Sequence, residues 1–327
     1  MNKMVISSIL EKVGNTPVIK LDTPELPDVN LFCKLEYYNP TGSVKDRAAC
    51  YILQKCLREK IIDQDTTIIE SSSGNFGVAL AAYCKLFSLK FICVIDPNIS
   101  PINEMLIGSY YNSEICKVTT IDKNGGYLLA RIEKVKELKA SIKNSYWINQ
   151  YGNELNAEAY YKSLGEEICT DFNTGLDYVF LGVSSGGTIT GVSRRIKERF
   201  PEVAVIAVDM EGSVIFGAKP MKRSIPGIGS SMVPDILKSA LIDQVVWVSE
   251  ADVIMNCQEL LNEHSIFSGG SSGAVYAAMK KFFSGFSRKY PVNVLCVLPD
   301  RGERYCNTIY NRQWCEEILA KRTILID

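Results

Sequence analysis

The feature that most constrains the fold is a repeated order of segments along the chain. A strand-like apolar run leads through a turn rich in Ser and Gly into a helical pattern, first in residues 67–87 and again in residues 177–200. Strands that alternate with helices in this way are typical of α/β units around a mainly parallel sheet. The sequence therefore predicts an α/β fold built on parallel strands.

The length of the chain and the absence of a linker-like run indicate how these units are grouped into domains. A chain of 327 residues is long for one core and suits two domains. No internal repeat, low-complexity tract or linker-like run divides it. We expect two α/β lobes joined by short connections.

The charge balance and the apolar pattern exclude some classes of partner. The chain has 36 basic and 37 acidic side chains, so bulk attraction to nucleic acid or to an anionic membrane is not expected. Its first residues do not resemble a signal peptide, and no apolar stretch approaches the roughly 18 residues that suggest a membrane span. We predict a cytoplasmic protein that binds neither nucleic acid nor membrane.

Eleven scattered cysteines and one histidine, His264, limit the chemistry further. No C-x-x-C pair occurs, and a single histidine cannot complete a Cys/His zinc set. We expect no metal site, and we expect the cysteines to be small buried apolar residues. Ser-His-Asp chemistry is also disfavoured.

The polar turn after the apolar run Val179–Val183 is the strongest candidate for a binding loop. Glycines there allow close approach of backbone N–H groups, hydroxyl groups add donors, and the following helix N-terminus adds positive partial charge. The turn lacks the ending of a P-loop and the glycine spacing of a dinucleotide-binding motif. It favours phosphate binding over a plain tight turn.

Three further polar stretches fit the same cleft. The turn at 70–77 can bind a small carboxylate or simply cap a helix, and the turn at 269–273 also suits a helix cap. The stretch 226–234 contains Gly227 in a loop suited to close approach. Several polar loops that face one cleft predict a ligand site better than any one of them does alone.

The stretch NPTGSVKDR, residues 39–47, places a turn signal directly before Lys45, which alone would be read as a surface cation. The stretches SSSGNFG, SSGGTITG and GGSSG follow it along the chain. In type, order and spacing, these four stretches resemble the motifs of the fold-type II pyridoxal-phosphate enzymes of the cysteine synthase/cystathionine β-synthase family. GNTP near the N-terminus and LPDRGERY near the C-terminus extend the resemblance over nearly the whole chain.

The resemblance implies that both lobes are three-layer α/β domains, and it implies how the chain is divided between them. Residues 1–36 and 148–327 would form a large cofactor-binding domain, and residues 37–147 a small mobile substrate domain. The active site would lie between them. Relatives of this family are commonly homodimers, so we expect a homodimer.

The resemblance also implies roles for individual residues. Lys45 would form the Schiff base with pyridoxal 5'-phosphate and later remove the Cα proton of the substrate. Asn75 would donate to the ring oxygen of the cofactor, and Ser271 would face the pyridine nitrogen. The cofactor phosphate would be held by Ser184, Ser185, Gly186, Gly187 and Thr188.

A hydroxyl opposite the pyridine nitrogen does not favour a protonated ring, so it disfavours long-lived carbanions. It suits loss of a β-leaving group to give an aminoacrylate, followed by addition of a second nucleophile. The reaction class implied is β-replacement on a serine-derived amino acid. The substrate carboxylate would be bound by Ser72, Ser73, Asn75 and Gln150.

Three residues depart from the usual pattern of cysteine synthases: Phe76 replaces a common threonine, Tyr151 a phenylalanine, and Ser184 a glycine. With other motifs, they resemble the branch of N-(2-amino-2-carboxyethyl)-L-glutamate synthases of siderophore and 2,3-diaminopropionate biosynthesis. That resemblance implies O-phospho-L-serine as donor and L-glutamate as nucleophile. Because glutamate brings two carboxylates, Arg131 is the candidate cation near the cleft mouth, with Tyr151 and Gly227 also in the substrate site.

Alternatives stay open at this point. Arg131 could instead be a solvated arginine on a helix face. The chain could be a cysteine synthase that uses O-acetyl- or O-phospho-serine with sulfide. It could also be an inactive homologue that acts as an interaction subunit, although Lys45, Asn75 and Ser271 are all present.

Overall fold

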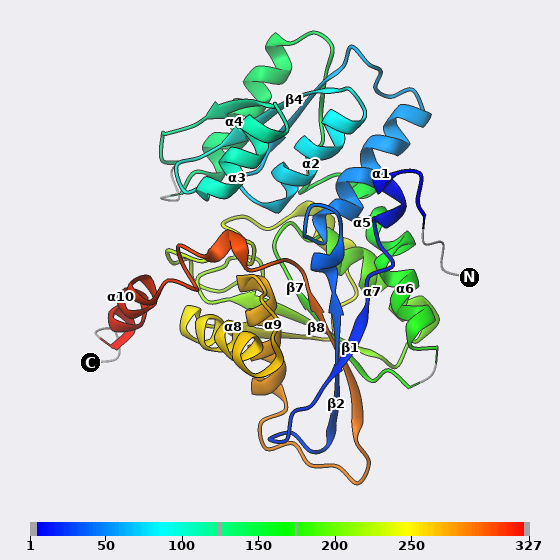
Figure 1. The fold of residues 1–327 in the computed structure, drawn as a ribbon, viewed down its shortest axis with the longest axis vertical. Coiled ribbons are helices and arrows are strands. Elements are labelled where there is room, and N and C mark those ends of the chain that lie inside the picture. The colour runs from blue at the N-terminus through cyan, green and yellow to red at the C-terminus, as the bar shows by residue number, and fades with distance from the viewer. Residues whose placement is uncertain (1–4, 123–125, 174, 324–327) are drawn as a thin grey trace.

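Two mainly parallel sheets form the framework of the protein, as a computed structural model of residues 5–122, 126–173 and 175–323 shows (Figure 1). The larger sheet has the strand order β1 (Val18–Leu21), β2 (Val29–Leu35), β10 (Val292–Leu298), β7 (Tyr178–Gly182), β8 (Ala204–Met210) and β9 (Gln244–Val248). The smaller sheet has the order β5 (Glu114–Lys117), β4 (Lys90–Ile95), β3 (Thr67–Ser71) and β6 (Ser145–Trp147). Only β1 pairs antiparallel among these strands. The prediction of two α/β lobes with mainly parallel sheets is confirmed.

Helices cover both faces of each sheet. Around the smaller sheet and at its border with the larger one are α1 (Lys45–Arg58), α2 (Asn75–Leu86), α3 (Pro101–Met105) and α4 (Leu128–Ser141). Around the larger sheet are α5 (Glu154–Lys162), α6 (Leu164–Asp171), α7 (Gly187–Arg199), α8 (Glu250–His264), α9 (Gly270–Phe282) and α10 (Arg312–Thr323). Short 3-10 turns lie at Ile9–Lys12, Glu36–Tyr38, Asp235–Ser239 and Glu303–Tyr305, and a π-helical turn follows α3 at Leu106–Tyr110.

Burial on both faces explains why the strands are continuous apolar runs. Along β3, Ile68 belongs to the core cluster that contains α2, whereas its neighbour Ile69 packs with Val135 of α4 on the opposite face. Alternate side chains of a strand point to opposite faces, so a strand covered on both faces is apolar at most positions. The same alternation in β7 places Val179 and Phe180 in two different clusters.

Helix α1 joins the two lobes. It packs against α2 on one side and α5 on the other, and a single core cluster of buried side chains extends from α1 into both lobes. The four strands of the smaller sheet lie within residues 67–147. The domain boundaries at residues 36/37 and 147/148 stay a prediction.

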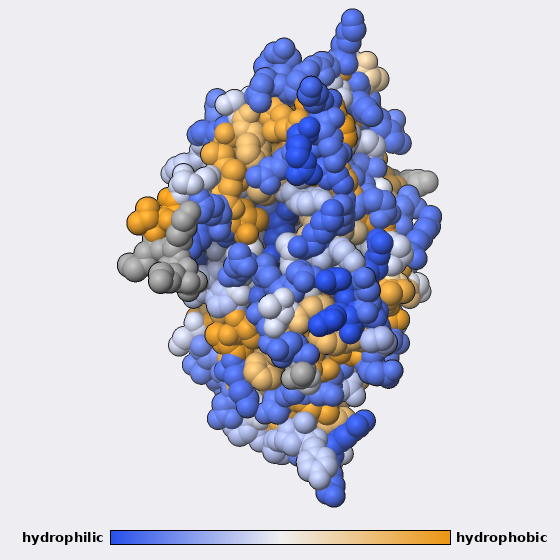
Figure 2. Space-filling view, turned by 90° about the vertical axis from the view of Figure 1, so that its right-hand side faces the viewer, coloured by the Kyte–Doolittle hydropathy of each residue, from blue (hydrophilic) through white to orange (hydrophobic). Residues whose placement is uncertain are grey.

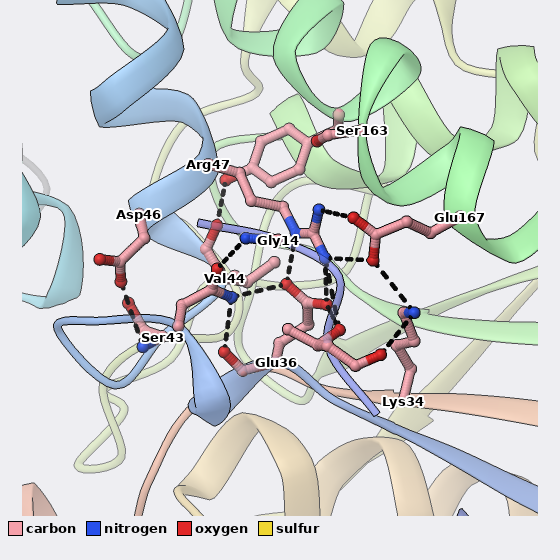
Figure 3. A network of polar contacts seen from close by, with 12 residues as sticks. Gly14, Lys34, Glu36, Ser43, Val44, Asp46, Arg47, Ser163 and Glu167 are labelled. Carbon is pink, nitrogen blue, oxygen red and sulfur yellow. Dashed lines mark hydrogen bonds and ion pairs between the residues drawn. The ribbon is translucent and has the colours of Figure 1, made fainter. Parts of the chain in front are cut away.

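A buried network of charged side chains lies behind the first turn of α1 (Figure 3). Arg47 Nε lies 2.6 Å from Glu36 Oε2, and Arg47 Nη1 lies 2.6 Å from Glu167 Oε1. Lys34 Nζ of β2 reaches Glu167 Oε2 at 3.0 Å. The network ties α1 to β2 and α6, and Glu36 within it is fully buried.

The face shown in Figure 2 is mainly hydrophilic, with hydrophobic residues in separate patches. Separate apolar residues on a surface are normal for folded proteins. Within the described ranges, no helix is long and apolar enough to cross a membrane.

The cysteine side chains behave as small apolar residues, as predicted. Nine of the eleven are buried, Cys116 is half-buried and only Cys306 is exposed. Burial raises the pKa of the Cys93 thiol to about 12, so this thiol stays protonated and unreactive at neutral pH.

The Arg47 network predicts a large effect of one substitution on stability. Arg47→Met keeps most of the side-chain volume but leaves the Glu36 carboxylate buried without its partner. We expect the free energy of unfolding to fall by about 3–5 kcal/mol, because breaking a buried ion pair leaves an uncompensated charge. Urea unfolding of the apoprotein measures the change.

Arg312→Met provides the matched control, because Arg312 pairs with Glu316 where its side chain is 93% exposed. That variant should unfold at the wild-type urea midpoint. Equal midpoints for Arg47→Met and the wild type would show that the network adds nothing to stability.

Candidate active site

Lys45 is the first residue of α1, and the turn before it is held by Asp46. The Asp46 carboxylate accepts hydrogen bonds from Thr41 N at 2.9 Å, Thr41 Oγ1 at 2.6 Å and Tyr83 Oη at 2.6 Å. The backbone N–H of Val44 donates to the carbonyl of Pro299, just after β10, at 2.8 Å. These bonds fix the start of α1 and attach it to the larger lobe.

The Lys45 amine lies at a half-buried position between the lobes. Its Nζ atom is 3.4 Å from Ser185 Oγ at the end of β7. Burial lowers the pKa of the Lys45 amine to about 8, and the nearby Asp300 carboxylate opposes this shift. A sizeable fraction of the amine is therefore neutral near physiological pH, which makes it available as a nucleophile or base.

The turn between β7 and α7 forms one wall of a cavity beside Lys45. Gly186 has φ of +86°, a left-handed conformation that favours glycine, and it precedes the N-terminus of α7. The cavity is lined by Lys45, Ser184, Ser185, Gly186, Thr188, Gly227, Ser271 and the apolar residues Val44, Leu181, Ile189, Val297 and Pro299, with Gly182. Among the five residues predicted to hold the cofactor phosphate, Gly187 alone does not line the cavity, because it packs against Asn156.

The residues around this cavity fit pyridoxal phosphate. A 13-residue helix begins at the turn, so its first N–H groups and the hydroxyl donors of Ser185 and Thr188 suit a phosphate. A lysine amine with a lowered pKa suits attachment of an aldehyde carbon. The apolar lining residues suit an aromatic ring, and Ser271 brings a hydroxyl to the same cavity.

A buried carboxylate, Asp300, connects the cavity to the substrate loop. It accepts hydrogen bonds from Ser271 Oγ at 3.1 Å, Asn75 Nδ2 at 2.8 Å and Tyr305 Oη at 2.7 Å. Arg304 Nη1 donates to the amide oxygen of Asn75. Because these contacts fix the amide orientation, one N–H of Asn75 remains for a ligand.

Asp300 and Arg304 lie in the stretch LPDRGERY and were not among the site residues predicted from the sequence. Asp300 lies just after β10 and Arg304 in the 3-10 turn Glu303–Tyr305 that follows, and β10 lies next to β7 in the sheet. Because parallel strands end at one edge, polar residues after β10 meet the turn after β7. This position after a buried strand was a signal that could have identified them.

The loop between β3 and α2 contains the predicted carboxylate-binding serines. Ser72 Oγ accepts the Gly77 N–H at 3.0 Å, so this hydroxyl caps α2. Ser73 Oγ donates to Asp96 Oδ2 at 2.8 Å and accepts from Arg131 Nη1 at 2.9 Å. Arg131 also pairs with Asp96 at 3.2 Å. The interpretation of Arg131 as a solvated helix-face arginine is wrong, because its side chain is only 12% exposed.

Gln150 and Tyr151 lie where the chain passes from β6 back toward the larger lobe. Gln150 Nε2 donates to the carbonyl of Ser71 at 3.0 Å, so the structure brings Gln150 against the serine loop. Burial raises the pKa of the Tyr151 phenol, and the Arg131 guanidinium opposes that rise. The predicted residues thus form a cavity group and a serine-loop group, which the Asn75–Asp300–Ser271 contacts connect.

Comparisons with known proteins agree with this geometry. Residues 9–300 match the family model described as "Pyridoxal-phosphate dependent enzyme". An O-acetylserine-dependent cystathionine β-synthase from Helicobacter pylori is 32% identical, with a TM-score of 0.87 over 94% of this chain and 100% of that chain. A hydrogen sulfide-producing enzyme from Fusobacterium nucleatum is 28% identical, with a TM-score of 0.85 over 92% and 100% of the chains. An O-ureido-L-serine synthase is 28% identical, with a TM-score of 0.83 over 93% and 94%.

The lowered pKa of Lys45 predicts how cofactor uptake depends on pH. The rate at which apoprotein takes up pyridoxal phosphate should rise with pH and reach half its maximum near pH 8, because only the neutral amine attacks the aldehyde. Visible absorbance after mixing, followed from about pH 6 to about pH 10, measures this rate.

Asp300→Asn serves as the second variant, because removing the negative charge removes the contribution that raises the Lys45 pKa. The midpoint should then move to lower pH. A wild-type midpoint near the ordinary lysine value of 10.5 would contradict the placement of Lys45 in a desolvated site.

Proposed function

The chain belongs to the pyridoxal-phosphate-dependent enzyme family, and we propose that it catalyses β-replacement on O-phospho-L-serine with the amine of L-glutamate as nucleophile. The products would be N-(2-amino-2-carboxyethyl)-L-glutamate and phosphate, for siderophore biosynthesis. The observation that supports the reaction class most strongly is the Lys45 amine, 3.4 Å from Ser185 in a cavity that also contains Ser271.

Each part of the cavity has a task in this proposal. Bound pyridoxal phosphate supplies electron withdrawal from the Cα atom of an amino acid. The turn Ser184–Thr188 holds its phosphate, Asn75 donates its remaining N–H to the ring oxygen, and Ser271 faces the pyridine nitrogen. Asp300 orients both Asn75 and Ser271, because it accepts a hydrogen bond from each.

Lys45 is the proposed general base. Its pKa of about 8 lies close to physiological pH, and a base is most effective when its pKa is near the working pH. The amine would take the Cα proton of the donor amino acid and hold it within the half-buried site. Loss of the β-substituent then opens Cβ to the nucleophile.

The donor is proposed to lie against the serine loop. Ser72, Ser73, Asn75 and Gln150 would bind its α-carboxylate. Arg131 contacts Ser73 directly, and its Nε atom is a buried donor without a partner among the described residues. Arg131 therefore lies closer to the donor loop than the sequence hypothesis assumed, where its N–H groups can bind an anionic donor.

Phosphate as the leaving group is an anion and a weak base, so it needs hydrogen-bond donors more than a general acid. Ser184 lines the cavity next to the cradle and can contribute a hydroxyl. Tyr151, half-buried beside Gln150, can contribute a phenol. These two positions are the departures from the usual pattern that favour a more polar pocket than sulfide requires.

The relatives support a serine derivative as donor. The cystathionine β-synthase from Helicobacter pylori is named as dependent on O-acetylserine, which carries a substituent on the serine oxygen. A cysteine synthase-like reaction with sulfide is the second candidate. We also propose a cytoplasmic homodimer in which residues 37–147 move as a small domain when substrates bind.

The proposal predicts the product of a competition between nucleophiles. The purified holoenzyme is incubated with O-phospho-L-serine and equal concentrations of L-glutamate and sulfide, and the products are identified by mass spectrometry. We expect the glutamate adduct to exceed cysteine by at least about tenfold, which corresponds to roughly 1.4 kcal/mol of preference in the transition state.

Lys45→Ala is the matched control and should form neither product. Cysteine as the main product would replace the glutamate assignment with the cysteine synthase reading. A wild-type holoenzyme whose visible spectrum does not change on addition of O-phospho-L-serine would support an inactive interaction subunit.

A further inference from the structure

The proposed nucleophile, L-glutamate, carries two carboxylates, so its binding site needs positive charge. The arginines near the cavity differ in whether a carboxylate of the protein already compensates their charge. Arg131 lies 3.2 Å from Asp96, and both side chains are nearly buried. An ion pair in such surroundings leaves little net positive charge for a second anion. In the proposed function Arg131 offers the donor its N–H groups rather than a free charge. The two carboxylates of glutamate therefore need another cation.

Arg223 is a half-buried cation in the loop between β8 and β9 of the larger lobe. Its Nη2 atom donates to Ser231 Oγ at 3.0 Å, and its Nη1 atom lies 3.5 Å from the carbonyl of Ile228. Among the described residues, no carboxylate oxygen lies within 4.0 Å of its guanidinium. Neutral acceptors of its own loop thus hold the group in place and leave its charge uncompensated by contact.

The loop that positions Arg223 borders the cofactor cavity. Gly227 of this loop lines the cavity, and the Gly229 N–H donates to the carbonyl of Val183 at 2.7 Å, directly before Ser184. Gly229 has φ of +71°, and a side chain there would collide with Arg223 Nη1. Glycine at this position therefore allows the guanidinium to pack over the loop, close to the phosphate cradle.

The Tyr151 phenol is affected by the charges of both arginines. Burial raises the pKa of this phenol, and the positive charges of Arg131 and Arg223 both oppose that rise. A guanidinium from the smaller lobe and one from the larger lobe thus lie within electrostatic reach of one phenol. A cleft with cations on both sides suits two anionic substrates bound in succession.

The alternative to a ligand-binding role is a purely structural role for Arg223, because the carboxylates of Asp209 and Glu250 act on it electrostatically. Glu250 Oε1 accepts the N–H groups of Ser224 and Ile225, the latter at 3.0 Å, so this oxygen is used to hold the loop. Asp209 is fully buried, and one of its oxygens has no hydrogen-bond partner among the described residues. Arg223 could balance the Asp209 charge, and in that case its loss would affect stability rather than selectivity.

We propose that Arg223 binds a carboxylate of the incoming amino-acid nucleophile and thereby selects an anionic amine over smaller nucleophiles. The inference rests on the proposed function, because it assigns the second substrate's subsite in that same cleft. The planar guanidinium matches a carboxylate in a bidentate manner, which an ammonium group cannot reproduce.

The test compares Arg223→Gln, Arg223→Lys and the wild-type holoenzyme in two measurements. The first is kcat/KM for L-glutamate at saturating O-phospho-L-serine. The second is the apparent Kd of O-phospho-L-serine without glutamate, from the change in visible absorbance of the bound cofactor. Lys222→Gln removes an exposed positive charge from the adjacent position and is the matched control.

Arg223→Gln should lower kcat/KM for glutamate about 10- to 100-fold, the effect of losing a hydrogen bond to a charged group, and change the donor Kd less than about threefold. Arg223→Lys should recover part of the loss, and Lys222→Gln should match the wild type. An unchanged kcat/KM for glutamate, or equal losses in both measurements, would overturn the role of Arg223. A wild-type enzyme that forms no glutamate adduct would instead overturn the proposed function.

Discussion

The structure depends on the placement of one lysine amine at a partly desolvated position between two lobes. Removing a charged amine from water costs free energy, which the protein reduces by lowering the pKa of Lys45 to about 8. The two residues that follow it in sequence hold it there: Asp46 binds the preceding turn, and Arg47 enters the buried network with Glu36 and Glu167.

Asp300 extends this arrangement across the cleft. It contacts Asn75 of the smaller lobe and Ser271 of the larger one, and it acts electrostatically on Lys45. The family resemblance implies only a hydroxyl, that of Ser271, opposite the pyridine nitrogen, whereas the structure adds the buried Asp300 carboxylate behind that hydroxyl. Groups from three distant parts of the chain therefore share one electrostatic environment.

Local patterns predicted the parallel sheets, the turn at Gly186 and the turn before Lys45, because each depends on neighbours in sequence. The contact of Asn75 with Asp300 joins residues 225 positions apart, and no local pattern encodes it. The pairing of Arg131 with Asp96 likewise depends on how α4 packs beside the serine loop. Arg223 was missed because an arginine in an irregular loop has no periodic signal, and only the close approach at Gly229 shows where it lies.

The most direct measurement of the central claim is to locate the lysine that attaches the cofactor. The holoenzyme is reduced with borohydride, digested with trypsin, and the peptide that carries the pyridoxyl group is identified by mass spectrometry. The account predicts modification of Lys45 alone, with no modified peptide from Lys45→Ala. Attachment to a different lysine, or no attachment in the wild-type protein, would contradict it.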